Sequence, residues 1–257
     1  MKRLIVTAVV AVVLLPVAPV QAAADPLAAL DKRVYAGRGV AFVDTTSIVG
    51  ETREKFVARK GRLQFGGGVR LAASDISAEF FGQGPDLHPE VLSPGRAIMI
   101  GKTSYTKGLG YEVPEGKTWF VEKNGRPSGS ATIFGQLVYP GETATLDMLL
   151  RHGRRSGRVY SGWINLSELH DISPWLRRAV GDRREFAATA NLRYQLTLDA
   201  RNLPKHLVTD VNGENLIPDR GWDRVDLRTV TTYSGWGAKV SIKAPPAGTV
   251  SNVLLKE

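Results

Sequence analysis

The 257-residue sequence contains no cysteine. This absence excludes disulfide bonds, zinc-cysteine sites, iron–sulfur ligation, thiol nucleophiles and lipid anchors attached through cysteine. Hydrophobic residues make up 43% of the chain and charged residues 23%, which is typical of a globular protein and not of a disordered one. A chain of this length can bury roughly 70–75% of the surface that its unfolded form exposes.

The sequence also lacks an apolar run long enough to cross a membrane. Its N-terminal run, Leu4–Leu15, has 12 residues, whereas a membrane helix needs about 20. The run follows two basic residues and ends at Pro16, before three consecutive alanines, as in a secretory signal. We therefore expect residues 1–24 to be a cleaved signal peptide, with a retained membrane anchor as the alternative. Residues 25–257 are then a single domain, secreted and not lipid-anchored.

Acidic residues are fewer than basic ones. The formal charge is +9, and it becomes +7 (32 − 25) once the two basic residues of the signal are removed. Much of this excess falls between positions 151 and 184, where eight arginines face three acidic residues, a balance of +5 (8 − 3). Such a basic surface could bind an anionic membrane or cell-wall surface; the alternative is a solvated face that confers solubility. An exported protein is not expected to bind nucleic acid. The arginines are Arg151, Arg154, Arg155, Arg158, Arg177, Arg178, Arg183 and Arg184.

Motifs that carry catalysis are missing. No serine lies in a Gly-x-Ser-x-Gly string, and no histidine pair has the His-Glu-x-x-His spacing. Two Gly-Lys-Thr triplets, at 101–103 and 116–118, lack the upstream glycine spacing of a phosphate loop and lead into strands. We expect no catalytic residue, no cofactor and no metal site. The four scattered histidines are expected to be structural, with a catalytic or metal role as the alternative: His88, His152, His170 and His206.

Most of the chain has the pattern of β-strands. In 69–81, apolar side chains alternate with polar ones, so that Asp75 falls on a solvated face beside the apolar face of Ile76. The same alternation recurs in 192–199. The expected strands are 40–49, 55–65, 69–81, 96–100, 104–107, 118–123, 192–199, 207–211, 224–233 and 239–244.

Three stretches have helical spacing instead. A short N-terminal helix is expected within 25–34, because Pro26 suits a first helical position. Apolar residues three and four apart predict a helix within 142–153, capped by Thr145 and ended by a left-handed Gly153. A third helical stretch, 167–180, is expected to restart at Ser173-Pro174.

The order of these elements predicts the fold class. About ten or eleven strands with no β-α-β alternation favour an α+β fold, in which an antiparallel sheet has its helices gathered on one face.

Several strings, taken in order, resemble the LppX/LprG group of actinobacterial cell-envelope lipid carriers, which is related in fold to the LolA and RseB envelope proteins. The resemblance covers about residues 28–255, and no single string is diagnostic. It rests on the paired strands at 61–81, on Tyr105 with 116–120, on the helix 145–151 with 157–162, on 194–200, and on 233–246.

The resemblance implies a strongly curved, half-open antiparallel β-barrel, LolA-like, with helices covering its concave side. An apolar cavity between sheet and helices would hold acyl chains, and such a cavity can bind them without a specific sequence motif. Members of the group are typically anchored by a lipidated cysteine, which this chain lacks, so it is expected to be free in the extracytoplasmic space. The cavity candidates are Ile76, Ala78, Phe80, Ile98, Ile100, Trp119, Val121, Leu196 and Leu198; plain core packing is the alternative for each.

Three functions remain open at this point. The first is a soluble carrier of a lipid or lipoprotein, with a lipid or acylated ligand as its partner. The second is an RseB-like sensor or interaction module that regulates an envelope membrane protein. The third is a hydrolase of wall or lipid esters, which the missing nucleophile motif disfavours. A mostly apolar cavity of about 300 Å³ or more would favour the carrier, whereas a filled core would favour the module.

Overall fold

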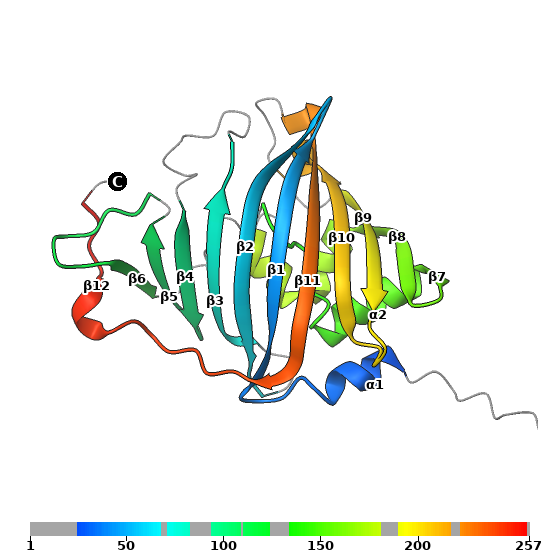
Figure 1. Ribbon diagram of the computed structural model, residues 1–257, viewed down its shortest axis with the longest axis horizontal. Helices are drawn as coiled ribbons and strands as arrows, with labels where there is room; N and C mark the ends of the chain where they lie inside the picture. Colours follow the sequence, from blue (N-terminus) through cyan, green and yellow to red (C-terminus); the bar gives the residue numbers. More distant parts are fainter. Residues whose placement is uncertain are drawn as a thin grey trace, which may run out of the picture.

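In the part of the chain that the structure describes, twelve strands form one sheet, with helices against one of its faces (Figure 1). This computed structural model describes residues 25–67, 71–82, 94–108, 110–123, 134–180, 190–216 and 222–255. The strand order is β12-β6-β5-β4-β3-β2-β1-β11-β10-β9-β8-β7. Neighbouring strands are antiparallel, except that β12 runs parallel to β6. The sheet is open, with β12 and β7 at its two edges, and the α+β class predicted from the sequence is confirmed.

The strands lie close to where the sequence pattern placed them. Those of the N-terminal half are β1 (Arg38–Val49), β2 (Arg53–Phe65), β3 (Leu71–Phe80), β4 (Gly95–Ile100), β5 (Thr103–Gly108) and β6 (Trp119–Lys123). Those of the C-terminal half are β7 (Arg154–Ser156), β8 (Val159–Asn165), β9 (Asn191–Leu198), β10 (Pro204–Asn212), β11 (Asp226–Lys239) and β12 (Val250–Ser251).

The helices begin at residues that satisfy their free backbone amides. Asp25 accepts a hydrogen bond from the Leu27 amide and Asn165 accepts one from the Ser167 amide, which fixes the starts of two helices. The hydroxyl of Ser173 accepts from the Leu176 amide, so a helix restarts there as predicted. The helices are α1 (Pro26–Asp31), α2 (Thr143–His152), α3 (Leu166–Ile172) and α4 (Pro174–Val180), with short 3-10 turns η3 (Gly213–Asn215), η4 (Trp222–Arg224) and η5 (Ala247–Thr249).

Some details of the predicted elements are wrong. The strand expected at 239–244 does not form, because β11 already extends to Lys239 and the chain then leaves the sheet. Strands β7, β8 and β12 were not expected, so the sheet has twelve strands instead of ten or eleven. Gly153 is extended, with φ −89°, since β7 begins at the next residue. The helix before it is capped at Glu142 and not at Thr145.

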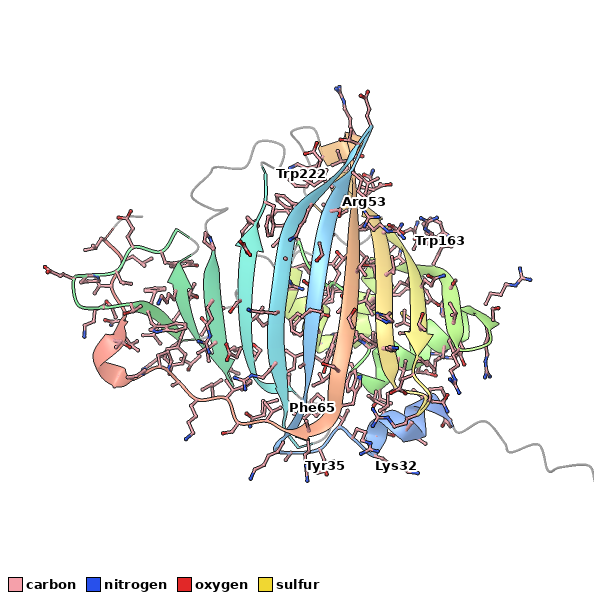
Figure 2. All side chains as sticks on the ribbon, in the orientation of Figure 1. Lys32, Tyr35, Arg53, Phe65, Trp163 and Trp222 are labelled. Atoms are coloured by element: carbon pink, nitrogen blue, oxygen red, sulfur yellow. The ribbon has the colours of Figure 1, made fainter. Side chains whose placement is uncertain are left out.

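The core lies between the helices and the strands from β3 through β1 to β8. Two aromatic groups occupy its opposite ends (Figure 2). At one end Trp222 stacks on Phe134, with ring centroids 5.5 Å apart, and both contact Phe56. At the other end Trp236 stacks on Phe65 at 6.2 Å. These aromatic side chains fill the core at the two ends of the strands.

No helix in the described part of the chain is both long enough and apolar enough to cross a membrane. Residues 1–24, the expected signal peptide, lie outside the described residues, and the assignment of 25–257 to a single domain stays a prediction.

Candidate functional site

The two faces of the sheet can be told apart by hydrogen bonds to the helix layer. The Tyr194 hydroxyl of β9 donates to the Leu149 carbonyl of α2 at 2.6 Å, so Tyr194 faces the helices. Directly paired residues of neighbouring strands carry their side chains on the same face, and the register runs Tyr194, Thr209, Thr229, Thr46, Val57, Phe80. We call this the helix face and the opposite one the far face.

The nine cavity candidates divide between these two faces. Five lie on the helix face, namely Ile76, Ala78 and Phe80 of β3 and Leu196 and Leu198 of β9. The other four lie on the far face, namely Ile98, Ile100, Trp119 and Val121. On the helix face, β3 and β9 are five strand steps apart, or about 24 Å measured along the sheet at roughly 4.8 Å per step. Ile76, Ala78, Leu196 and Leu198 nevertheless belong to one hydrophobic core, and Phe80 packs against it. Their role in ligand binding stays a prediction.

The far-face position of Ile98 follows from its pairing. It lies opposite Asp75 on one side and Tyr105 on the other. Ile98 and Trp119 are nevertheless buried, at 5% and 8% exposed. The far face is therefore not uniformly solvated at this end of the sheet.

The helix face of β3–β5 is lined by small side chains. The register places Ile76 beside Ala97 and Thr106, and the next row places Met99 between two serines. The helices with the most extensive sheet contacts, α2 and α3, pack against β8, at the other end of the sheet. We call the following residues the small-side-chain strip; all are buried: Ser74, Ala78, Ala97, Ser104 and Thr106.

The helix face at the centre of the sheet is filled instead. Asp44 and Arg59 form an ion pair with side chains 0% and 1% exposed. The backbone of Gly135 lies directly on the Arg59 guanidinium, where a Cβ atom on Gly135 would have no space. The Tyr233 hydroxyl donates to the side-chain oxygen of Gln136 at 2.8 Å. Buried polar groups thus occupy the middle of the helix face of β1, β2 and β11.

Glu142 connects α2 to the junction of α3 and α4. One carboxylate oxygen accepts from the Trp175 amide at 2.7 Å, and the other accepts from the hydroxyls of Ser173 and Thr145. Burial raises the pKa of Glu142, although these hydrogen bonds and the charge of Arg177 act in the opposite direction. The geometry is that of a structural tie between helices.

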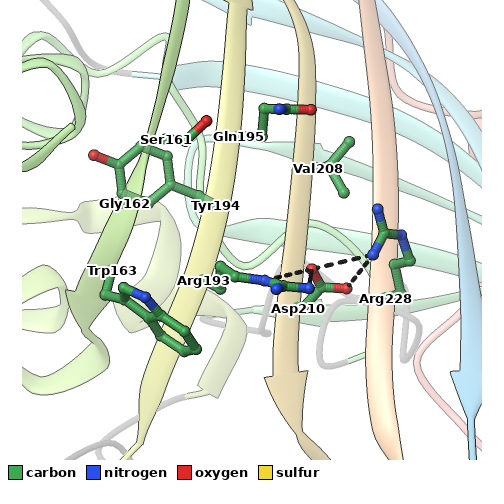
Figure 3. A pocket seen from close by; sticks show the side chains of 9 residues that line it. All are labelled: Ser161, Gly162, Trp163, Arg193, Tyr194, Gln195, Val208, Asp210 and Arg228. Atoms are coloured by element: carbon green, nitrogen blue, oxygen red, sulfur yellow. Dashed lines mark hydrogen bonds and ion pairs between the residues drawn. The ribbon is translucent and has the colours of Figure 1, made fainter. Parts of the chain in front are cut away.

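A groove of about 470 Å³ lies on the far face of β8–β11 (Figure 3). Across its floor Asp210 bridges two arginines: Arg193 reaches it at 3.0 Å and Arg228 at 3.0 Å from the other side. Trp163 borders the groove beside Arg193 and is 61% exposed. The rest of the lining consists of Ser161, Gly162, Tyr194, Gln195 and Val208. The sequence pattern predicted none of these residues as a site; the only signal was that Arg193 and Gln195 alternate with buried residues.

A second cluster of the same composition lies on the far face of β2–β4. Asp75 accepts from Arg96 at 2.7 Å and from Arg62 at 3.3 Å. Burial raises the pKa of Asp75, but the hydrogen bonds and charges of Arg96 and Arg62 together outweigh it, and the pKa is lowered. The expectation that Asp75 would be simply solvated is therefore wrong.

Of the eight arginines in the predicted basic surface, six are described. Arg154 and Arg155 lie exposed on the edge strand β7, with Arg158 just after it, and Arg151 pairs with Asp147 on α2. Arg177 donates to the carbonyls of His170 and Asp171 at the end of α3, so this side chain also stabilises the end of that helix. Arg178 is half-buried on α4, and Arg183 and Arg184 lie outside the described residues.

The described histidines lie on three different elements, α2, α3 and β10. His152 is exposed in the last turn of α2, as expected from the sequence. His170 is buried in α3, and the Nδ1 atom of His206 is 3.0 Å from the Thr232 hydroxyl oxygen. Within the described part of the chain, no three His, Asp or Glu side chains are grouped closely enough to hold a metal ion. His88 is not among the described residues.

Comparisons with known proteins give likenesses of structure only. No family model matches the sequence, and no curated protein matches it. Among solved structures, the chain is similar to LprF from Mycobacterium bovis, with a TM-score of 0.43 and 14% identity over 86% of this chain and 95% of LprF. It is also similar to a LolA superfamily protein from Nitrosomonas europaea, with a TM-score of 0.27 and 10% identity over 81% of this chain and 90% of the other.

LprF belongs to the LppX/LprG group, so the resemblance predicted from the sequence is confirmed as a likeness of structure. A porin-like protein from Bacteroides uniformis is also similar, with a TM-score of 0.25 and 10% identity over 78% of this chain and 98% of the other. At these levels of similarity neither a site nor a ligand is carried over to this chain.

Proposed function

We propose that this chain is a non-enzymatic binding protein of the cell envelope that carries a lipid or an acylated ligand. The observation that supports the proposal is the small-side-chain strip on the helix face of β3–β5. Helices α2 and α3 lie mainly over the other end of the sheet. These positions are buried, and an acyl chain is the expected ligand for them because it needs shape and freedom from water and no charged partner.

The energetics favour this kind of ligand. Each methylene group removed from water contributes about 0.8 kcal/mol. Ala78 and Ala97 are buried but have small side chains, so an acyl chain that entered here would displace little protein volume, and Met99 beside them can adjust its shape to the ligand. A bound chain would lie across β3–β5, where the small side chains are grouped.

Native mass spectrometry of the chain, purified from its natural host without detergent, tests the proposal directly. We expect a species heavier than the polypeptide by the mass of a lipid. A polypeptide mass with nothing bound, after gentle purification, would count against the carrier.

Two matched substitutions test the position of the ligand. Ala97→Phe places a ring on the strip, whereas Ser77→Phe places the same ring on the far face of β3. With a dansyl-labelled fatty acid as the probe, we expect Ala97→Phe to weaken binding at least tenfold, or about 1.4 kcal/mol, and Ser77→Phe to leave it unchanged. Ser104→Leu repeats the test on β5, in case Ala97→Phe does not fold. Equal binding by the strip and far-face variants would refute the location.

A second candidate is an envelope sensor or interaction module similar to RseB. The packed interior beneath β1, β2 and β11, with its buried Asp44–Arg59 pair, favours it, since a filled core leaves partners to bind outside. Chemical cross-linking in intact cells distinguishes the carrier from the interaction module. A module should be trapped repeatedly with one membrane protein, whereas a shuttle should give no dominant partner.

Further parts of the proposal concern topology and location. The sheet would form a half-open barrel whose concave side is the helix face, and residues 1–24 would be removed on export as a signal peptide. The mature domain would then be free outside the cytoplasm, and the arginines at the β7 edge could rest on an anionic membrane. Sedimentation with vesicles of phosphatidylglycerol, compared with phosphatidylcholine, tests the last point.

A further inference from the structure

The far-face groove has an arrangement of side chains that the carrier proposal does not use. Four paired positions run straight across β8–β11: Trp163, Arg193, Asp210 and Arg228 (Figure 3). These residues are up to 65 positions apart in sequence, yet the register brings them into one row. The groove lies on the opposite face from the small-side-chain strip, so a ligand here would not compete with an acyl chain.

The row is held in a fixed geometry by Asp210. Its carboxylate is 18% exposed and binds Arg228 through both oxygens, at 3.0 and 3.3 Å, and Arg193 through Oδ2 at 3.0 and 3.3 Å. Both guanidinium groups remain partly open to solvent, at 54% and 33% exposed. Charge-assisted bonds of this kind keep the flat guanidinium planes in place before a ligand arrives.

Trp163 is the exception among the tryptophans of this chain. The other four are at most 8% exposed, whereas Trp163 is 61% exposed. An indole ring presents a broad apolar face and one N–H donor. Placed at the border of a groove with fixed polar groups, such a ring offers a flat surface for stacking.

The chemistry of the lining selects among ligands. An inorganic anion would meet the Asp210 carboxylate between the two arginines, and an acyl chain would have to desolvate three charged groups. A sugar ring avoids both costs: its hydroxyls can donate to Asp210 and accept from the arginines and Gln195, while its C–H face stacks on the indole. The volume of about 470 Å³ is in the range of small-molecule sites, roughly 300–1,000 Å³.

We propose that this groove is a carbohydrate-binding site, with Trp163 as the stacking platform and the Arg193–Asp210–Arg228 row as the group that binds the hydroxyls. This site is independent of the proposed lipid carriage. It would let one face hold a glycan while the other holds an acyl chain.

The test uses the full chain on a microarray of bacterial surface glycans, followed by calorimetric titration with the strongest binder. We expect saturable binding to at least one neutral oligosaccharide. Trp163→Ala should weaken it at least tenfold, and Trp163→Tyr should retain part of it, because a ring remains. Since Trp163 is exposed, its removal should leave the melting temperature unchanged.

Two controls keep the result specific. Arg96→Ala alters the second arginine–aspartate cluster and should leave glycan binding unchanged, and so should Val43→Ala, which removes an exposed apolar side chain elsewhere on the far face. Absence of any saturable glycan binding, or equal binding by Trp163→Ala, would overturn the proposal. Competition by millimolar inorganic phosphate that displaces the glycan completely would also overturn it, in favour of an anion site.

Discussion

Removing one member of the buried Asp44–Arg59 pair should destabilise this protein more than removing any exposed charge. The two side chains lie directly opposite each other on β1 and β2, with Arg59 Nε 3.0 Å from Asp44 Oδ1. Both are at most 1% exposed. In Asp44→Ala, the Arg59 guanidinium stays beneath the Gly135 backbone and beside the Phe42 ring, without its carboxylate partner.

The magnitude follows from the cost of a buried charge. Breaking a buried pair by removing one partner costs about 3–5 kcal/mol, whereas replacing both partners by apolar residues of similar volume is often neutral or stabilising. We therefore expect Asp44→Ala to lower the free energy of unfolding by about 4 kcal/mol. The double variant Asp44→Leu/Arg59→Met should lose less than either single variant.

Urea denaturation, followed by tryptophan fluorescence, measures the effect as a shift of the midpoint at constant slope. The matched control is Asp147→Ala, which breaks the exposed pair with Arg151 on α2 and should cost only about 0.3–0.5 kcal/mol. If Asp44→Ala fails to fold, Asp44→Asn keeps the side-chain volume and tests the charge alone. Equal losses for Asp44→Ala and Asp147→Ala, or a double variant as unstable as the two single losses added together, would refute the reasoning.

Three further predictions concern the helix layer. Tyr139→Phe should stabilise the protein by about 1 kcal/mol, because the buried Tyr139 hydroxyl meets no partner among the described residues. Tyr233→Phe should destabilise it by about the same amount, because the hydrogen bond to Gln136 is lost. Thermal unfolding of the two variants measures both effects. Gly162→Ala should cost about 1–3 kcal/mol, because a Cβ atom would lie 2.6 Å from the His152 carbonyl oxygen, while Gly248→Ala, with open space around it, should be neutral in the same assay. Because the pKa of Glu142 is raised above its ordinary value of 4.5, the native state holds this proton more tightly than the unfolded chain, so its contribution to stability should grow as pH falls through the raised pKa towards 4.5 and then level off. Glu142→Gln should abolish that pH dependence, and an unchanged profile in this variant would show that another group titrates.

The sequence predicted most strands and the main helices because their signals are local. In β3, the alternation of Asp75 with Ile76 correctly separated the two faces of that strand. The restart at Ser173-Pro174 could be predicted in the same way, because a hydroxyl N-cap followed by proline favours the start of a helix. Edge strands such as β7, with three exposed polar residues, carry no such signal.

The candidate site could not be predicted in the same way, because it depends on register between strands. Alternation shows which residues of one strand share a face, but it does not relate that face to the next strand. In β4, Ala97, Ile98 and Met99 are all buried, so this strand carries no alternation at all. The sequence therefore gives no reason to separate Ile98 and Ile100 from Ile76, although the pairing places them on the opposite face.

The two arginine–aspartate clusters of the far face show how the same charge pattern can serve different ends. In each, one aspartate binds two arginines, and a tryptophan lies beside one of them. At Asp75 the guanidinium of Arg96 covers the ring of Trp119, 5.8 Å from its centroid, and that ring is buried. At Asp210 the two arginines are held by the carboxylate, and Trp163 stays exposed. In the first cluster Arg96 covers the ring of Trp119 and so stabilises the sheet. In the second cluster the ring of Trp163 stays open to a ligand. Exposure of the ring, and not the charge pattern, is therefore what distinguishes a binding site from a structural cluster on this sheet.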